Sequence, residues 1–247
     1  MTGRARRKQD RAYWDRMAHR WDAEIFNTLH HDKFGVIATE LERSSRQAHS
    51  VADFGCGTGI YLPLLGRLFD EVRGYERSRA CVALARKRVR RLRNITVHPA
   101  GSASRRRGRF DVVLCVNVAV HPSLRSRASV LRTVRSLLAR GGRLIVVVPA
   151  LESATMVAAA EREALRGRPG SRAAEWDAEA HPNGVVTIEG MPYQHYTRRE
   201  LRESLVNLGL TVSRIRRVAY SWQSQGVRAG PQFRSRLPWD WIAVARG

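Results

Sequence analysis

The sequence is poor in cysteine and has no long apolar run. It holds three cysteines among 247 residues, and their number and spacing indicate neither a disulfide framework nor a metal site. No apolar run approaches the roughly 20 residues that span a bilayer, which argues against a membrane partner. The basic N-terminus leads into a charged helical pattern and not into an apolar segment, which argues against a secretory signal. We therefore expect a cytoplasmic protein.

Acidic residues and lysine are also scarce. There are 22 acidic residues against 44 basic ones, a formal net charge of +22, and only three of the basic residues are lysine, so 44 − 3 = 41 are arginine. Two interpretations stay open. The excess charge serves a surface that binds RNA or another polyanion, or it reflects a drift toward arginine along the whole chain. The arginines are dispersed, with runs at 86–93 and 105–109, and this favours the compositional interpretation.

What the sequence does contain is a glycine-rich segment, DFGCGTG, at residues 53–59. Residues 51–54 predict a short buried strand, and residues 60–69 predict a helix whose free N–H groups face the loop. A second short strand ends in Glu76, 17 residues beyond Gly59 (76 − 59). An acid at the tip of this strand commonly holds ribose hydroxyls. The segment therefore predicts a nucleoside-binding βαβ unit.

The spacing of the glycines distinguishes between nucleoside ligands. The dinucleotide pattern G-x-G-x-x-G would need a glycine at position 60, which is Ile60. Asp53 is unfavourable beside a pyrophosphate, but it suits a ligand with positive charge, such as an ammonium group beside a sulfonium. A nicotinamide-dependent oxidoreductase is therefore a disfavoured alternative.

The segment DFGCGTG resembles the D-x-G-x-G-x-G motif of class I S-adenosylmethionine-dependent methyltransferases. The resemblance covers about residues 10–247, most clearly 51–148, and implies S-adenosylmethionine as the cofactor. It departs from the family at 101–103, where no acid lies beside the adenine, and at Arg140, which replaces the proline of an L-x-P-G-G-x-L turn. The residues that the resemblance assigns to the cofactor are Trp14, Trp21, Asp53, Gly55, Cys56, Gly57, Thr58, Gly59, Glu76, Arg77, Ser102, Ala103, Asn117 and Val118.

Strands and helices alternate along the rest of the chain. The apolar patterns predict further strands at 95–98, 111–116, 144–148, 210–218 and 239–245, and helices at 78–92, at 124–139 and after a capping box at 197–200. The pair Gly141-Gly142 is expected to cap the helix at 124–139. This alternation predicts an α/β fold, a doubly wound and mostly parallel seven-stranded sheet with helices on both faces.

We expect a disordered basic tail over 1–9 and a single domain over 10–247. Two helices, one from residue 10 and one at 31–43, predict a helical cap over 10–46. The resemblance matches Trp14-Asp15, Ala18 and Trp21-Asp22 to a pattern that touches the methionine end of the cofactor, although packing alone would also explain these aromatic residues. Residues 151–195 interrupt the alternation with a helix at 153–166 and a break at 167–171. This insertion is expected to cover the second substrate.

Methyl transfer requires an acceptor held in line with the methyl group, and it requires a base only when the acceptor is protonated. His121, just after the fourth strand, is the first candidate base and His195 the second. Tyr193 and Tyr196 are candidate walls of the acceptor pocket. Each histidine could instead be a hydrogen-bonded structural residue. No metal is expected.

The segment after the fourth strand bears on the identity of the acceptor. Asn117 begins this segment, NVAV, which lacks the N/D-P-P-Y/F motif of adenine N6 methyltransferases, and Cys115 falls inside the apolar strand. The cap and the insertion look more like those of small-molecule methyltransferases. We therefore predict transfer to an oxygen, nitrogen or sulfur atom of a small molecule. The alternative is an RNA methyltransferase that uses the basic surface on tRNA or rRNA.

Overall fold

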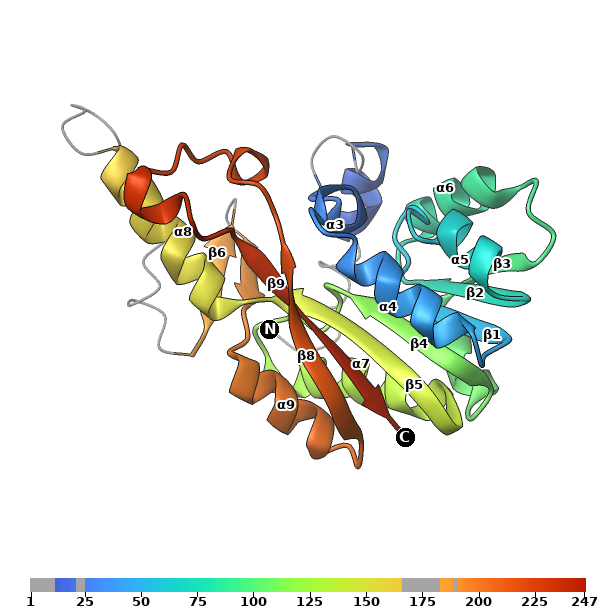
Figure 1. Ribbon diagram of the computed structural model, residues 1–247. Helices are drawn as coiled ribbons and strands as arrows, with labels where there is room; N and C mark the ends of the chain where they lie inside the picture. The colour runs from blue at the N-terminus through green and yellow to red at the C-terminus, as the bar shows by residue number, and fades with distance from the viewer. Residues whose placement is uncertain (1–11, 21–24, 166–182, 189–190) are drawn as a thin grey trace.

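The computed structural model describes residues 12–20, 25–165, 183–188 and 191–247. The predictions for the tail at 1–9, for Trp21 and for the break at 167–171 lie outside these residues. A seven-stranded sheet in the order β3-β2-β1-β4-β5-β9-β8 forms the centre of the molecule (Figure 1). Its strands are β1 Ser50–Phe54, β2 Glu71–Glu76, β3 Ile95–Pro99, β4 Phe110–Val116, β5 Leu138–Pro149, β8 Thr211–Ala219 and β9 Trp239–Arg246.

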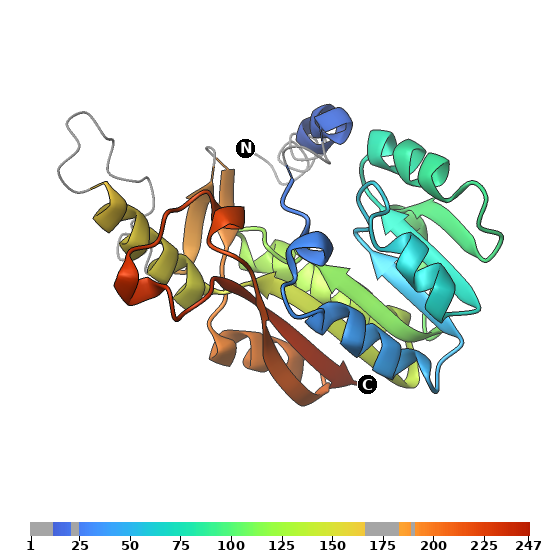
Figure 2. The same cartoon turned by 45° about the horizontal axis from the view of Figure 1, so that its top comes forward.

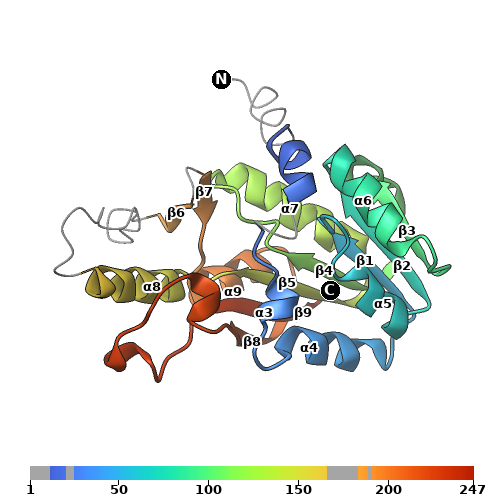
Figure 3. The ribbon, with the colours of Figure 1, turned by 90° about the horizontal axis from the view of Figure 1, so that it is seen from above.

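The first five strands pair in parallel, and β9 runs antiparallel between β5 and β8. Helices cover both faces, as Figure 3 shows for α4 and α5 on one side and α7 on the other. The predicted doubly wound, mostly parallel sheet is confirmed. The main helices are α4 Val36–Ser45, α5 Leu62–Leu68, α6 Arg79–Val89, α7 Leu124–Leu137 and α9 Arg198–Val206.

Two buried clusters pack on the two faces of the sheet. One joins α4, α5 and α6 to the sheet through residues such as Ile37, Leu65 and Val82. The other joins α7 and α9 to the opposite face through residues such as Val134 and Leu205. Because successive side chains of a strand point to opposite faces of the sheet, each strand contributes buried side chains to both clusters.

The structure corrects the prediction for the helix at 124–139. The helix α7 ends at Leu137, because Leu138 already pairs with Phe110 of β4 at the start of β5. Gly141 and Gly142 do not cap the helix. They lie within β5 and exchange backbone hydrogen bonds with Gly247 at 3.0 and 3.1 Å.

The N-terminal helical region also differs from the prediction. Residues 12–17 are helical and continue into η1 Ala18–Arg20, while α3 covers only Thr28–His31. The predicted helix at 31–43 is interrupted, because the Asp32 carboxylate accepts the backbone N–H of Ile37 at 2.8 Å and Gly35 adopts a φ of +60°. The chain therefore turns before α4 begins.

The insertion after β5 consists of a helix and a hairpin, α8 Leu151–Ala164, β6 Val185–Ile188 and β7 Met191–Gln194. The hairpin is fixed to the carboxyl end of the sheet. Gln194 donates its backbone N–H to the carbonyl of Val120 after β4, and Tyr196 donates to Pro149 at the end of β5. Figure 2 shows the insertion and the N-terminal helical segment on either side of this end of the sheet.

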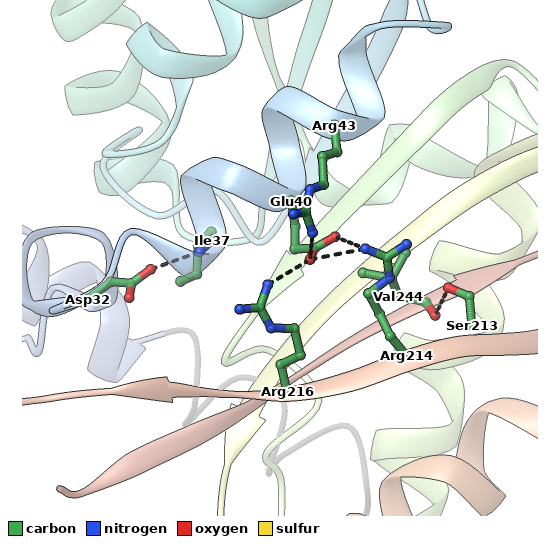
Figure 4. A network of polar contacts seen from close by, with 8 residues as sticks. All are labelled: Asp32, Ile37, Glu40, Arg43, Ser213, Arg214, Arg216 and Val244. Atoms are coloured by element: carbon green, nitrogen blue, oxygen red, sulfur yellow. Dashed lines mark hydrogen bonds and ion pairs between the residues drawn. The ribbon is translucent and has the colours of Figure 1, made fainter.

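A buried carboxylate ties α4 to the edge strand β8. Glu40 is 2% exposed, and its oxygens lie 3.2–3.4 Å from guanidinium nitrogens of Arg43, Arg214 and Arg216 (Figure 4). A buried charge left unpaired is costly, so three arginines around one carboxylate keep α4 on the sheet. This network accounts for part of the arginine excess by a structural role.

Candidate functional site

The glycine loop leaves the carboxyl end of β1 at the centre of the sheet. Gly55, Gly57 and Gly59 have φ angles of +82°, +54° and +83°, values that favour glycine. A Cβ on Gly55 would lie 2.2 Å from a methyl of Val118, and a Cβ on Gly59 would lie 3.1 Å from the Cβ of Ala85 on α6. The glycines therefore let the loop approach the segment after β4 on one side and α6 on the other.

Glu76 closes the loop from the tip of β2. One carboxylate oxygen accepts the backbone N–H of Gly57 at 3.0 Å, and the other accepts those of Arg77 and Ser78 at 2.6 and 2.7 Å. A carboxylate has about four lone-pair sites, so these three bonds leave room for one further donor. Burial raises the pKa of Glu76 despite these bonds, which favour the charged form.

Asp53 lies beneath the loop with 2% of its surface exposed. Burial, and then the nearby Glu76 carboxylate, raise the pKa of Asp53 to about 8. In the described part of the chain, no hydrogen bond reaches its buried Oδ2, the hydroxyl oxygen of Thr58 or Oδ1 of Asn117. Buried polar atoms are normally paired, so these three atoms point to a ligand in the loop. Two carboxylates at its centre suit the positively charged ligand predicted from the sequence.

Asn117 ends β4 in a strained conformation beside this loop. Its φ of +53° is the only positive φ among the described non-glycine residues. Its backbone N–H donates to the carbonyl of Val147 on β5 at 2.9 Å. Such strain persists only where the surrounding structure enforces it, and it is concentrated at functional sites. The next residue, Val118, lies against Gly55 of the loop. A contact of Asn117 and Val118 with the cofactor stays a prediction.

The N-terminal helical segment is anchored at the start of α6. The Asp15 carboxylate accepts the Ser78 hydroxyl at 2.6 Å and the Ala80 backbone N–H at 3.3 Å. The carbonyl of Trp14 lies 3.9 Å from the Cys81 sulfur. Trp14 is thus held near Glu76, since Ser78 bonds to both acids, while its predicted partner Trp21 lies outside the described residues.

The remaining cofactor candidates are placed less favourably. Cys56 is buried between the loop and β2, with its sulfur 2.9 Å from where a Gly74 Cβ would be. Arg77 is exposed. Ser102 donates its hydroxyl to the carbonyl of Pro99 at 2.8 Å, and Ala103 is fully buried in the core. An adenine contact at these two positions would therefore come from backbone groups.

The two candidate histidines lie on different segments at the carboxyl end of the sheet. The Nδ1 of His121 accepts the backbone N–H of Ser123 at 2.9 Å, and the histidine side chain is half-buried. His195 is 4% exposed, and burial lowers its pKa to about 4. His195 is therefore neutral at physiological pH and a weak proton acceptor.

Of the two candidate pocket tyrosines, Tyr193 lies in the hairpin and Tyr196 follows it. Tyr196 is 4% exposed, donates its hydroxyl to the carbonyl of Ala119 and has the Arg127 guanidinium over its ring at 5.9 Å. Through this hydrogen bond, Tyr196 holds the segment after β4 in place. Tyr193, three residues before it, is half-buried within β7. Of the two, Tyr193 is the better placed to touch a ligand.

A polar group that the sequence pattern did not reveal lies on the α4 face of the sheet. The Tyr220 hydroxyl donates to Asp240 Oδ2 at 2.9 Å, and the Asn117 amide lies 3.5 Å from the same oxygen. The Tyr61 hydroxyl bonds to that of Thr28 at 2.5 Å. In the sequence, Asp240 is one residue of the last predicted strand and belongs to no motif. The one signal that could have identified it is its place between Trp239 and Trp241, because side chains alternate along a strand and an acid there points to the opposite face of the sheet from the two tryptophans.

A cavity of about 580 Å³ opens beside Thr58, between η1 and α6. Four cations on α6 and just after it line it, so it suits an anion and not the cationic ligand expected in the loop. Its lining residues are Ala18, His19, Thr58, Leu84, Lys87, Arg88, Arg90 and Arg91. The cavity therefore does not mark the acidic cradle at Asp53 and Glu76.

Among the residues that the structure describes, no three or more His, Cys, Asp or Glu side chains are grouped so that they could bind a metal ion. Within the same ranges, none of the helices has the length and apolarity needed to cross a membrane.

Comparison with known proteins points to one family. A family model described as a methyltransferase domain matches residues 13–215. No curated protein matches the sequence significantly.

Solved structures show the same fold at low identity. A 1,6-didemethyltoxoflavin N1-methyltransferase from Burkholderia thailandensis, solved with 1,6-didemethyltoxoflavin and S-adenosylhomocysteine, is 15% identical with a TM-score of 0.67, over 100% of this chain and 90% of that chain. The DhpI–SAM–HEP complex is 19% identical with a TM-score of 0.61, over 100% of both chains. The [4+2]-cyclase SpnF is 16% identical with a TM-score of 0.57, over 85% and 79%. Because the fold also carries a cyclase, the reaction must be argued from the site.

Proposed function

The chain belongs to the class I S-adenosylmethionine-dependent methyltransferases, and we propose that it methylates an oxygen, nitrogen or sulfur atom of a small molecule. When bound, S-adenosylmethionine supplies a methyl group already activated by its sulfonium. The protein then has to hold cofactor and acceptor in line, which accounts for most of the rate enhancement in such a transfer.

The single observation that carries the proposal is the acidic cradle around the glycine loop. Asp53 begins the loop segment and Glu76 bonds to the middle of the loop, within a chain of formal charge +22. The unpartnered atoms of Asp53, Thr58 and Asn117 face this region. A nucleoside with a net positive charge satisfies these groups, whereas a dinucleotide pyrophosphate does not.

Each residue of the cradle has a distinct proposed task. Glu76, already oriented by three backbone N–H groups, accepts a ribose hydroxyl at its remaining site. Asp53 balances the positive charge of the ligand's amino acid end. Asn117 and Val118 line the cofactor near its sulfur, and Trp14 covers it from the N-terminal segment. Ser102 and Ala103 offer backbone groups to the adenine.

We propose that the acceptor binds next to the methyl group on the cofactor's sulfur, between the helical cap and the insertion. The hairpin is bonded to the segment after β4 and to the end of β5, the two strands nearest the expected methyl group. Tyr193 is proposed as a wall of this pocket, and His121 is proposed to contact the acceptor. The toxoflavin methyltransferase of similar fold was solved with bound 1,6-didemethyltoxoflavin, and this supports a small-molecule acceptor here.

A second candidate function, methylation of RNA, is favoured by the charge and by the cation-lined cavity beside Thr58. A phosphate backbone crossing Lys87, Arg88, Arg90 and Arg91 would place a nucleotide near the glycine loop. Against it, the segment after β4 lacks the motif with which adenine-modifying enzymes hold an extruded base.

Two experiments test the proposal. Thermal unfolding with S-adenosylmethionine, S-adenosylhomocysteine or NAD tests the cofactor, because a ligand that binds the native state raises the melting temperature. We expect a shift with the first two and none with NAD. Labelled methyl transfer into a metabolite extract and into total RNA tests the acceptor. Label confined to RNA would contradict the small-molecule proposal.

A further inference from the structure

Asp240 is a carboxylate at the acceptor end of the sheet to which no role has yet been assigned. It is the second residue of β9 and pairs with Pro149 of β5 and with Val218 of β8. Since β5 ends at Pro149, Asp240 lies at the carboxyl end of the sheet, where ligands of open α/β folds bind. The flanking Trp239 and Trp241 pack on the α7 and α9 face, so Asp240 points to the face of α4 and the N-terminal segment.

Two neighbours orient one oxygen of this carboxylate and leave the other available. The Tyr220 hydroxyl donates to Oδ2 at 2.9 Å, and the Asn117 amide lies 3.5 Å from the same atom. Within the described ranges no hydrogen bond reaches Oδ1, and the side chain stays partly accessible to solvent. An accessible carboxylate oxygen can accept a proton from a bound acceptor and release it to water.

The same group connects to the cofactor loop through Asn117. Asn117 has a φ of +53° and offers its amide to Asp240, and its own buried Oδ1 has no hydrogen-bond partner among the described residues. Tyr61, which follows the loop, lies near both Asp53 and Asp240, because both acids raise its pKa in addition to the larger effect of burial. Asn117 therefore connects Asp240, which pairs with the end of β5, to the glycine loop.

We infer that Asp240, oriented by Tyr220, is the general base of the transfer and that the acceptor offers an O–H or N–H bond. This inference rests on the proposed function. The acceptor's lone pair attacks the methyl carbon while the carbon–sulfur bond breaks, and its electron pair stays on sulfur. The acceptor proton passes to Oδ1 of Asp240 and then to water. Tyr220 is a positioning residue.

The protonation behaviour of Asp240 agrees with this role. Burial raises its pKa to about 6, and the hydrogen bonds from Tyr220 and Asn117 limit the rise. Tyr220, just after β8, and Tyr61, just before α5, are the ionisable side chains near it, because burial first and then the Asp240 carboxylate raise the pKa of both. A base that titrates just below neutral pH is ionised at pH 7 and still holds a proton well enough to accept one.

The first test needs no acceptor. A carboxylate whose folded pKa is raised stabilises the fold below its unfolded pKa and loses that contribution as the pH rises through 6. Asp240→Asn, which keeps an oxygen for Tyr220, should therefore raise the melting temperature at pH 8, by roughly 2–4 °C on the usual scale for this size, and have no such effect at pH 4. The matched control is Asp111→Asn at the opposite end of the sheet. Asp111 accepts three hydrogen bonds from His49 and Ser50, and these bonds lower its pKa, so its loss should lower the melting temperature at pH 8.

The second test measures labelled methyl transfer from S-adenosylmethionine into a metabolite extract, with S-adenosylmethionine affinity measured separately by calorimetry. Asp240→Asn should reduce the initial rate of labelling by about 100-fold or more and change the affinity for S-adenosylmethionine by less than twofold. Tyr220→Phe removes a bond that lowers the pKa of Asp240, so the acid limb of its pH–rate profile should move to higher pH.

Wild-type rates in Asp240→Asn, or a fall in its melting temperature at pH 8 like that of Asp111→Asn, would overturn the inference. Failure of the proposed function has a different signature, namely that the wild-type protein binds no S-adenosylmethionine or labels no small molecule. In that case the inference fails together with the proposed function. The melting temperatures then show only whether the Asp240 carboxylate stabilises the fold.

Discussion

The backbone N–H of Gly57 donates to the carboxylate of Glu76 across 3.0 Å, from the middle of the glycine loop to the tip of the next strand. This bond joins the two sequence features, the loop and the terminal acid, into one rigid unit before any ligand binds. A preorganised carboxylate loses little freedom when it accepts a ligand hydroxyl, so its contribution to affinity is large for one side chain.

Replacing Glu76 should therefore weaken the cofactor complex. We expect Glu76→Ala to cost about 1–3 kcal/mol of binding free energy for S-adenosylmethionine, the scale for a hydrogen bond to a charged group. Glu71→Ala is the matched control, because Glu71 is an exposed acid at the other end of the same strand. Calorimetry that gave equal affinities for the two variants would refute the role of Glu76.

Asp53 should release a proton when the cofactor binds. Its pKa of about 8 keeps it mostly protonated at pH 7 in the free protein, and a positively charged ligand favours the ionised form. Below pH 8 the affinity for S-adenosylmethionine should rise with pH and then level off. Calorimetry in two buffers of different ionisation enthalpy measures this release, which we expect to be roughly one proton at most. Asp53→Asn should abolish it, and Asp53→Ala should weaken binding. A wild-type binding enthalpy independent of buffer would contradict this role of Asp53.

Gly57→Val should abolish cofactor binding in a protein that still folds. Gly57 has a φ of +54°, which a β-branched residue does not tolerate, and its N–H must keep its bond to Glu76. Gly209→Ala is the control, since Gly209 has a φ of +73° with no atom within 4 Å of a Cβ placed there. The control should lose roughly 1 kcal/mol of stability and keep wild-type affinity. A folded Gly57→Val variant that binds S-adenosylmethionine normally would exclude the loop from the cofactor site.

RNA retention by this protein should be weak, independent of sequence and lost as salt is raised, because counterion release alone would drive it. The arginines are dispersed along the chain, and Arg43, Arg214 and Arg216 are engaged by the buried Glu40. Filter binding of total RNA between low and high salt measures this. Retention of one defined RNA at high salt would favour the RNA-modifying alternative.

The alternating fold could be predicted because each element carries a local signal. β4 is apolar throughout and the capping box at Thr197 is formed as expected, with Glu200 returning the bond. The boundary between α7 and β5 could not be predicted, because it depends on Leu138 pairing with Phe110 across the sheet. The end of α7 is set by this pairing with a strand distant in sequence, and not by the glycines at 141 and 142.

The site shows the same division. The glycine loop and Glu76 were predictable because their spacing is fixed by one βαβ unit. Asp240 was not, because it reaches the loop only through the antiparallel pairing of β9 with β5 and through the strained Asn117. His195 was assigned a possible role from its neighbours, and only its burial reveals how weak a base it is.

The most direct test of the central claim is labelled methyl transfer from S-adenosylmethionine, measured in separated small-molecule and RNA fractions at low and high salt. We predict a discrete labelled small molecule whose formation persists at the salt level that abolishes RNA retention and is lost in Gly57→Val. One discrete methylated nucleotide in tRNA or rRNA, formed in the presence of competitor polyanions and lost when His121 or Asn117 is replaced, would contradict the claim.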